Sequence, residues 1–192
     1  MNNKVKCVVL LAVLISIIFG SINIGSVSEI PKFELPLLIT CTGQTSDYLT
    51  VYTLAKKLQI EAVNDPLITP RKMKEQGYKT MIVVMAVSLK GLGAARLNQE
   101  AELERCKLVF KEAKELGIKI IGAHIGGEAF RNVITDKFIT PFAPQCDYLI
   151  VLAEANKDGL FNRIAEKNNI PLNVFKTLAE LSSIIRTLFR LE

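Results

Sequence analysis

The chain has 192 residues, of which 49% are hydrophobic, 22% charged and 7% aromatic, with no Trp and one His. These proportions exclude an intrinsically disordered chain, a collagen-like repeat and a coiled coil, which need more biased compositions. Two of the 24 basic residues and none of the 19 acidic ones precede Val27, so the rest is nearly balanced in charge. We therefore expect one compact domain and no nucleic-acid partner.

The N-terminus has the features of an export signal. Lys4 and Lys6 precede an apolar run, Cys7–Phe19, that is too short to cross a hydrocarbon core of about 30 Å. We predict a signal peptide or N-terminal anchor over residues 1–28, a linker over 29–35 and a single α/β domain over 36–192. The expected location is extracellular or periplasmic, with membrane contact only through an uncleaved signal.

Strand and helix patterns alternate through this domain. Strands are predicted where apolar and β-branched residues run together, and helices where apolar residues recur every three or four positions. In chain order, the predicted elements are a strand over Leu37–Cys41, a helix over Ser46–Leu58 capped by Ser46 or Asp47, a strand over Ile60–Val63, a helix over Thr69–Gly77, a strand over Thr80–Val87, a helix over Asn98–Leu116, a strand over Ile118–Ala123, a helix over Glu128–Phe138, a strand over Asp147–Leu152, a helix over Gly159–Asn168, a strand over Leu172–Phe175 and a helix over Thr177–Leu188.

This alternation predicts the fold class. Strands that alternate with helices build a parallel sheet with helices on both faces, because the crossovers are right-handed. We expect a three-layer, doubly wound α/β domain after the N-terminal signal segment. The favoured strand order is the flavodoxin-like 2-1-3-4-5 with the last strand at an edge, and a Rossmann-like order is the alternative.

Polar or glycine-rich loops follow four of the predicted strands, and ligands bind at the carboxyl ends of such strands. The longest predicted loop, Ser88–Leu97, carries Lys90 and Arg96. Because helix N-termini favour anions, we expect a small polar or anionic ligand. Acidic residues in the same loops disfavour the binding of an anionic ligand. The predicted ligand-binding residues are Thr42, Gly43, Gln44, Thr45, Ser88, Lys90, Gly91, Gly93, Arg96, His124, Gly126, Gly127, Asn156 and Lys157.

Known cofactor motifs match this chain weakly. The hydroxyl-rich segment Thr40–Thr45 resembles the phosphate loop of flavodoxins, so FMN is an alternative cofactor, although a helix cap explains the same residues. Gly91–Arg96 begins like a dinucleotide fingerprint but lacks its third small residue. His124 has no histidine partner at metal-ligand spacing. We therefore expect neither a resident cofactor nor a metal site.

An enzymatic function is the alternative to simple binding. His124 follows a predicted strand and is a candidate acid or base, with Glu128 as a second candidate catalytic residue. Cys41 and His124 would form a thiolate pair if their strands were adjacent.

Three polar blocks, Ser88–Ala95, Gly122–Glu128 and Asn156–Phe161, resemble a family of small exported bacterial α/β proteins catalogued as a domain of unknown function. The resemblance covers about Pro36 to Leu188. It implies an exported α/β domain with functional loops, and it assigns no catalytic residue. The leading hypothesis is an exported small-molecule-binding protein. The alternatives are a hydrolase or transferase that uses His124, an FMN protein and a module that binds a protein partner.

Overall fold

The computed structural model describes residues 31–191 and contains one six-stranded, all-parallel sheet. The strands are β1 (Leu37–Thr42), β2 (Ala62–Asn64), β3 (Thr80–Met85), β4 (Lys119–His124), β5 (Tyr148–Leu152) and β6 (Leu172–Phe175). Their order is β2-β1-β3-β4-β5-β6. The prediction of a doubly wound α/β fold with the last strand at an edge is confirmed. The predicted signal segment, residues 1–28, lies outside the described residues.

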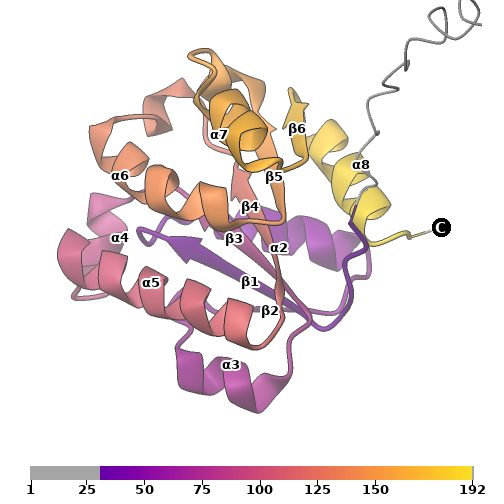
Figure 1. Cartoon of the computed structure of the whole chain (residues 1–192), viewed down its shortest axis with the longest axis horizontal. Helices are drawn as coiled ribbons and strands as arrows, with labels where there is room; N and C mark the ends of the chain where they lie inside the picture. The colour runs from indigo at the N-terminus through magenta and orange to yellow at the C-terminus, as the bar shows by residue number, and fades with distance from the viewer. Residues whose placement is uncertain (1–30, 192) are drawn as a thin grey trace, which may run out of the picture.

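Helices cover both faces of this sheet (Figure 1). The α-helices are α2 (Tyr48–Lys57), α3 (Pro70–Gln76), α4 (Leu89–Ala94), α5 (Gln99–Glu115), α6 (Val133–Phe142), α7 (Leu160–Asn168) and α8 (Leu178–Leu188). The short 3-10 helices are η1 (Glu128–Phe130), η2 (Ala143–Gln145) and η3 (Ala153–Asn156). Helices α3, α5, α6 and α7 pack on one face, and α2 and α8 pack on the other. Within residues 31–191, no helix is both long enough and apolar enough to span a membrane.

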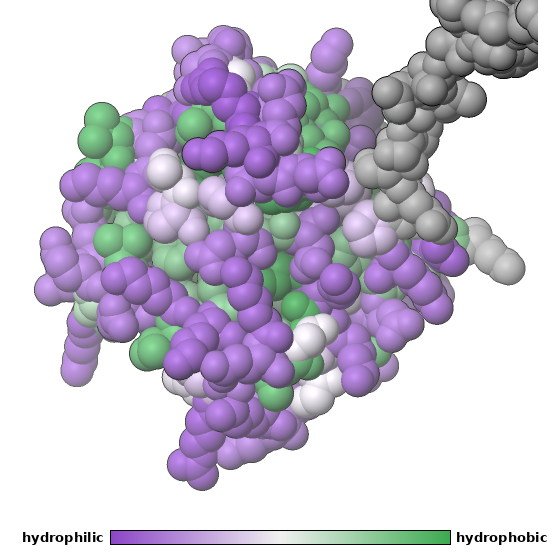
Figure 2. Space-filling view, viewed as in Figure 1, coloured by the Kyte–Doolittle hydropathy of each residue, from purple (hydrophilic) through white to green (hydrophobic). Residues whose placement is uncertain are grey.

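The core consists of two layers because the central strands are buried on both faces. All six residues of β1 and of β3 are buried. Alternate side chains enter opposite layers: Leu38 contacts the α5 layer, and Ile39 contacts the α2 layer. This explains why these strands are continuous apolar runs. Figure 2 shows that hydrophilic residues cover most of one outer face, with small separate hydrophobic areas.

Local signals fix several of the helix ends. Thr69 accepts a hydrogen bond from the Lys72 amide, Pro70 begins α3, and Gly77 ends it at φ +63°. These are the cap, first-turn proline and left-handed stop that the sequence predicts. For α2 the predicted side-chain cap is wrong: Asp47 occupies the cap position, but its carboxylate makes no capping hydrogen bond.

Three elements differ from the sequence prediction. The segment expected to be a long loop contains the six-residue helix α4, which begins where the Ser88 hydroxyl accepts from the Gly91 amide. Helix α6 begins five residues later than predicted, because Asn132 caps it by accepting from two amides. Strand β2 begins two residues later than predicted, because its register with β1 pairs Ala62 with Leu37. Each difference depends on a cap or on a partner strand.

Candidate functional site

The chain order reverses at the carboxyl ends of β1 and β3, the place where parallel sheets usually bind ligands. Here the two loops pack against each other. The Ser88 amide donates to the Gly43 carbonyl at 2.8 Å, and Gln44 forms an antiparallel bridge with Val87. A Cβ atom at Gly91 would lie 2.1 Å from the Gln44 carbonyl oxygen. Glycine is therefore required at position 91 so that α4 can cover the loop after β1.

A buried carboxylate holds this part of the edge together. Glu102 of α5 is fully buried and accepts from the Gly43 amide at 2.9 Å and from Gln44 Nε2 at 3.1 Å. Arg105 donates to both carboxylate oxygens, from Nη2 at 2.7 Å and from Nε at 2.8 Å. Its guanidinium also donates to the carbonyls of Cys41 and Ile68. Glu102 and Arg105 thus fix the loop after β1 to α5.

This network occupies two of the groups that a phosphate would need. The Gly43 amide donates to Glu102, and the Thr45 hydroxyl is buried and accepts from the Asp47 amide. A carboxylate at 2.9 Å from the loop amide repels a phosphate. Glu102 therefore disfavours the phosphate of FMN at the Gly43 amide.

His124 is the central polar residue of the other half of the edge. Its side chain is fully buried at the end of β4, and Nδ1 lies 2.6 Å from the Met85 carbonyl oxygen. Because a carbonyl oxygen only accepts, Nδ1 carries the proton and Nε2 presents a lone pair. Within residues 31–191, Nε2 has no hydrogen-bond partner. Burial lowers the pKa of His124 below its usual value of 6.5, and the nearby Arg131 lowers it further. The ring is therefore neutral at pH 7.

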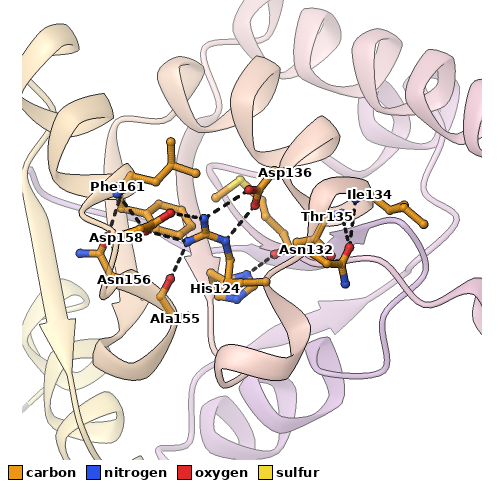
Figure 3. A network of polar contacts seen from close by, with 12 residues as sticks. His124, Asn132, Ile134, Thr135, Asp136, Ala155, Asn156, Asp158 and Phe161 are labelled. Atoms are coloured by element: carbon orange, nitrogen blue, oxygen red, sulfur yellow. Dashed lines mark hydrogen bonds and ion pairs between the residues drawn. The ribbon is translucent and has the colours of Figure 1, made fainter.

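Arg131 lies close to this histidine and joins two segments of the chain through Asp136, Ala155 and Asp158, which are labelled in Figure 3. Its guanidinium lies over the Phe161 ring at 5.5 Å, and the Phe161 and His124 ring centroids are 5.7 Å apart. Nε donates to Asp136 at 2.8 Å, and Nη2 donates to Asp158 at 2.9 Å. Nη1 donates to the Ala155 carbonyl. The Arg131 side chain is therefore already engaged by two carboxylates and a carbonyl.

A hollow of about 230 Å³ lies beside Arg131, between the segments that follow β4 and β5. It is lined by Glu128, Arg131, Asp136, Glu154, Ala155, Lys157 and Asp158. Four acidic residues outnumber two basic ones, so the lining is net negative. The volume is below the roughly 300–1,000 Å³ of pockets for drug-sized ligands. Larger hollows lie beside β6 and between α5 and α6, away from His124.

Unpartnered buried polar atoms occur in several elements near the carboxyl edge of the sheet. Among residues 31–191 there are six such side-chain atoms, and one of them, Glu112 Oε1, lies elsewhere. The other five are Thr40 Oγ1, Thr42 Oγ1, Asp47 Oδ2, His124 Nε2 and Thr135 Oγ1. They come from β1, the start of α2, β4 and the first turn of α6. Because β3 lies between β1 and β4, His124 Nε2 is separated from the threonines of β1.

The thiolate pair considered from sequence does not form. Strand β3 lies between β1 and β4, and the Cys41 side chain belongs to the α2 layer. Burial raises the pKa of Cys41 to about 12. Cys106 and Cys146 are also buried and free. These thiols act as small core residues.

The structure places the predicted ligand-binding residues in two groups. Those from Thr42 to Thr45 and from Ser88 to Arg96 lie over β1 and β3, with Lys90 and Arg96 exposed. Those from His124 to Gly127, with Asn156 and Lys157, lie over β4 and β5. Asn156 caps α7 by accepting from the Phe161 amide, and Lys157 pairs with the other catalytic candidate, Glu128.

Sequence reasoning missed the residues that organise both groups, namely Glu102, Arg105, Arg131 and Asp136. Glu102 precedes Cys106 by four positions and therefore lies on the buried stripe of α5. A carboxylate on an apolar stripe was the available signal. Arg131 and Asp136 carry no comparable signal, because Arg131 also depends on partners from the segment after β5.

A family model described as "Domain of unknown function (DUF6305)" matches residues 34–189. The chain belongs to the DUF6305 family. The DUF6305 match spans the entire sheet and the helices on both faces, and it confirms the resemblance to a family catalogued as a domain of unknown function. Comparison with curated proteins and with solved structures found no match.

We predict that Glu102→Ala lowers the free energy of unfolding by about 3–5 kcal/mol, because it leaves the largely buried Arg105 without its carboxylate. Urea denaturation measures this loss. Glu104→Ala is the matched control on the same helix, since the Glu104–Lys107 pair is exposed, and its effect should stay within about 0.5 kcal/mol. Equal losses in the two variants would contradict the role given to Glu102.

We predict that the neutral, buried state of His124 makes the protein less stable in mild acid. The unfolded chain binds the proton with a pKa near 6.5, and the folded chain binds it only at lower pH. The free energy of unfolding should therefore fall as the pH drops below about 6.5, by up to about 1.4 kcal/mol per pH unit. Urea denaturation across this range should show a flatter dependence in His124→Phe. An identical pH dependence in the two proteins would contradict a lowered pKa.

Proposed function

We propose that this protein binds a small polar ligand at the carboxyl edge of β4 and β5. The observation that carries the proposal is the unpartnered Nε2 of the fully buried His124 at the end of β4. A ligand that reached Nε2 would supply the missing hydrogen bond and would be selected by it. The proposal includes export for sensing or uptake, which is supported by the N-terminal sequence alone.

The chemistry of Nε2 favours a ligand that presents a hydrogen-bond donor. With the proton on Nδ1, Nε2 of the neutral ring only accepts. The hollow between the segments after β4 and β5 has a net negative lining. Amino, guanidinium or hydroxyl groups suit such a site better than an anion does.

Native mass spectrometry of the purified full chain, followed by thermal-shift measurements, tests this proposal. The probes are L-arginine, putrescine, glucose and inorganic phosphate. We expect a donor-bearing probe to raise the melting temperature, and His124→Phe to weaken its binding about tenfold, as loss of a buried hydrogen bond does. An apo mass together with no shift from any probe would contradict the proposal.

A second variant distinguishes a ligand that presents hydrogen-bond donors from the anionic ligand that the sequence favours. Lys90→Gln with Arg96→Gln removes the two exposed cations of the α4 segment. We expect unchanged affinity for the probe that binds, because these side chains lie over β3 and not beside His124. Strong weakening in this variant, together with phosphate binding, would favour the anionic ligand.

Catalysis by His124 is the second candidate function. A neutral imidazole with a fixed proton on Nδ1 and a free lone pair on Nε2 has the form of a general base. Turnover of a bound donor-bearing compound, abolished by His124→Phe without loss of fold, would establish it. Binding of such a compound without turnover would favour the binding function over catalysis.

A further inference from the structure

His124 is closed off from solvent even though it is central to the proposed site. Its side chain has no exposed surface. Its ring packs against Phe161, over which the Arg131 guanidinium lies. Residues 126–131 after β4 and residues 153–159 after β5 meet at Arg131. A ligand that enters from the hollow passes between these segments. The inference below rests on the proposed function and concerns how access to that site is controlled.

The two segments are joined by two ion pairs between side chains and by one hydrogen bond from a side chain to the backbone. Arg131 donates to Asp158 at 2.9 Å and to the Ala155 carbonyl. Lys157 forms an ion pair with Glu128. Figure 3 shows Asp158 and Ala155 close to the Phe161 ring, whose centroid is 5.7 Å from that of the His124 ring.

The exposure of these groups makes the contacts easy to break. Asp158, Lys157 and Glu128 are 55%, 63% and 70% exposed, so water solvates them when they separate. Exposed ion pairs of this kind contribute little to stability and are weakened by salt.

Arg131 itself keeps a partner when the segments part. Its side chain is only 9% exposed. Asp136, which accepts from Nε at 2.8 Å, belongs to α6 and not to the segment after β5 from which Arg131 would separate. Separation from Asp158 therefore leaves no buried charge without a counter-ion, which would be costly.

The ends of the first segment are held firmly. On one side, His124 is bonded to the Met85 carbonyl within the sheet. On the other side, Asn132 caps α6 by accepting from the amides of Ile134 and Thr135. Between these points lies the single 3-10 turn η1. The part able to move is thus residues 126–131, without disturbance of the sheet or of α6.

We propose that residues 126–131 form a gate over His124, latched to residues 153–159 by the Arg131–Asp158 and Glu128–Lys157 ion pairs. With the latch closed, the imidazole is shielded by Arg131 and Phe161. With the latch open, Nε2 is accessible to a ligand from the side of the hollow. Access to the proposed site is therefore governed by two ion pairs, each with at least one exposed partner.

The only histidine of the chain gives this gate a direct readout. Diethyl pyrocarbonate adds a carbethoxy group to a neutral imidazole nitrogen and releases ethanol and carbon dioxide. The rate at the His124 peptide, followed by mass spectrometry on the purified full chain, measures how often Nε2 is accessible. We expect the wild-type rate to lie well below that of N-acetylhistidine and to increase with sodium chloride concentration.

The test variant is Asp158→Asn with Lys157→Gln. Asparagine keeps the side-chain oxygen that accepts from the Leu160 amide, so the start of α7 is preserved. We expect the His124 rate to increase about fivefold, a size consistent with loss of exposed ion pairs. Lys119→Gln is the matched control, because it removes an exposed ion pair with Asp147 at the opposite edge of the sheet, and it should leave the rate unchanged.

Three outcomes would overturn the gate: a wild-type rate equal to that of N-acetylhistidine, an unchanged rate in the double variant, or an equal increase in the control. Hydrogen exchange distinguishes a gate from general destabilisation. Faster exchange confined to residues 126–131 and 153–159 supports the latch, and faster exchange throughout β1 and β3 overturns it. The measurement needs no ligand, so a failed gate leaves the binding proposal standing, and a failed probe panel leaves the gate standing.

Discussion

The burial of one carboxylate organises the carboxyl edge of this sheet. Glu102 bonds to the loop after β1 and to Arg105, which in turn bonds to the backbone of β1 and of the segment before α3. A buried carboxylate is tolerated only with such partners, so these elements must assemble together. The consequence is that these bonds hold together the half of the edge over β1 and β3. The proposed ligand site lies in the other half, over β4 and β5.

In that second half, one hydrogen bond determines the chemistry. The Met85 carbonyl places the proton on Nδ1 of His124, and burial together with Arg131 keeps the ring neutral. Nε2 is thus the ring nitrogen that accepts, and it has no partner within residues 31–191. The same Arg131 that lowers the pKa of His124 also joins the segments after β4 and β5. The protonation state of His124, and with it the proposed ligand preference and gate, therefore depends on a few neighbouring residues.

The sequence predicts those features that local patterns determine. Apolar runs such as Thr80–Met85 identify buried strands, and their alternation with helices predicts both the sheet and the edge that carries His124. Features that depend on tertiary partners are missed. Glu102 interrupts an apolar stripe and is explained only once the Gly43 amide is packed against it. Gly91 and Gly93 make the α4 segment resemble a loop in the sequence, because glycine disfavours helices. The helix is explained only by the Ser88 cap and by the close contact between Gly91 and Gln44.

The tautomer of His124 is the most direct test of this account. Nitrogen NMR of the single histidine in uniformly ¹⁵N-labelled protein distinguishes a protonated ring nitrogen from one with a free lone pair. At neutral pH the account predicts a protonated Nδ1 and an unprotonated Nε2, held in slow exchange. A proton on Nε2, protonation of both nitrogens, or an average of the two tautomers would contradict it, because Nε2 would not be the fixed acceptor on which the proposed site depends.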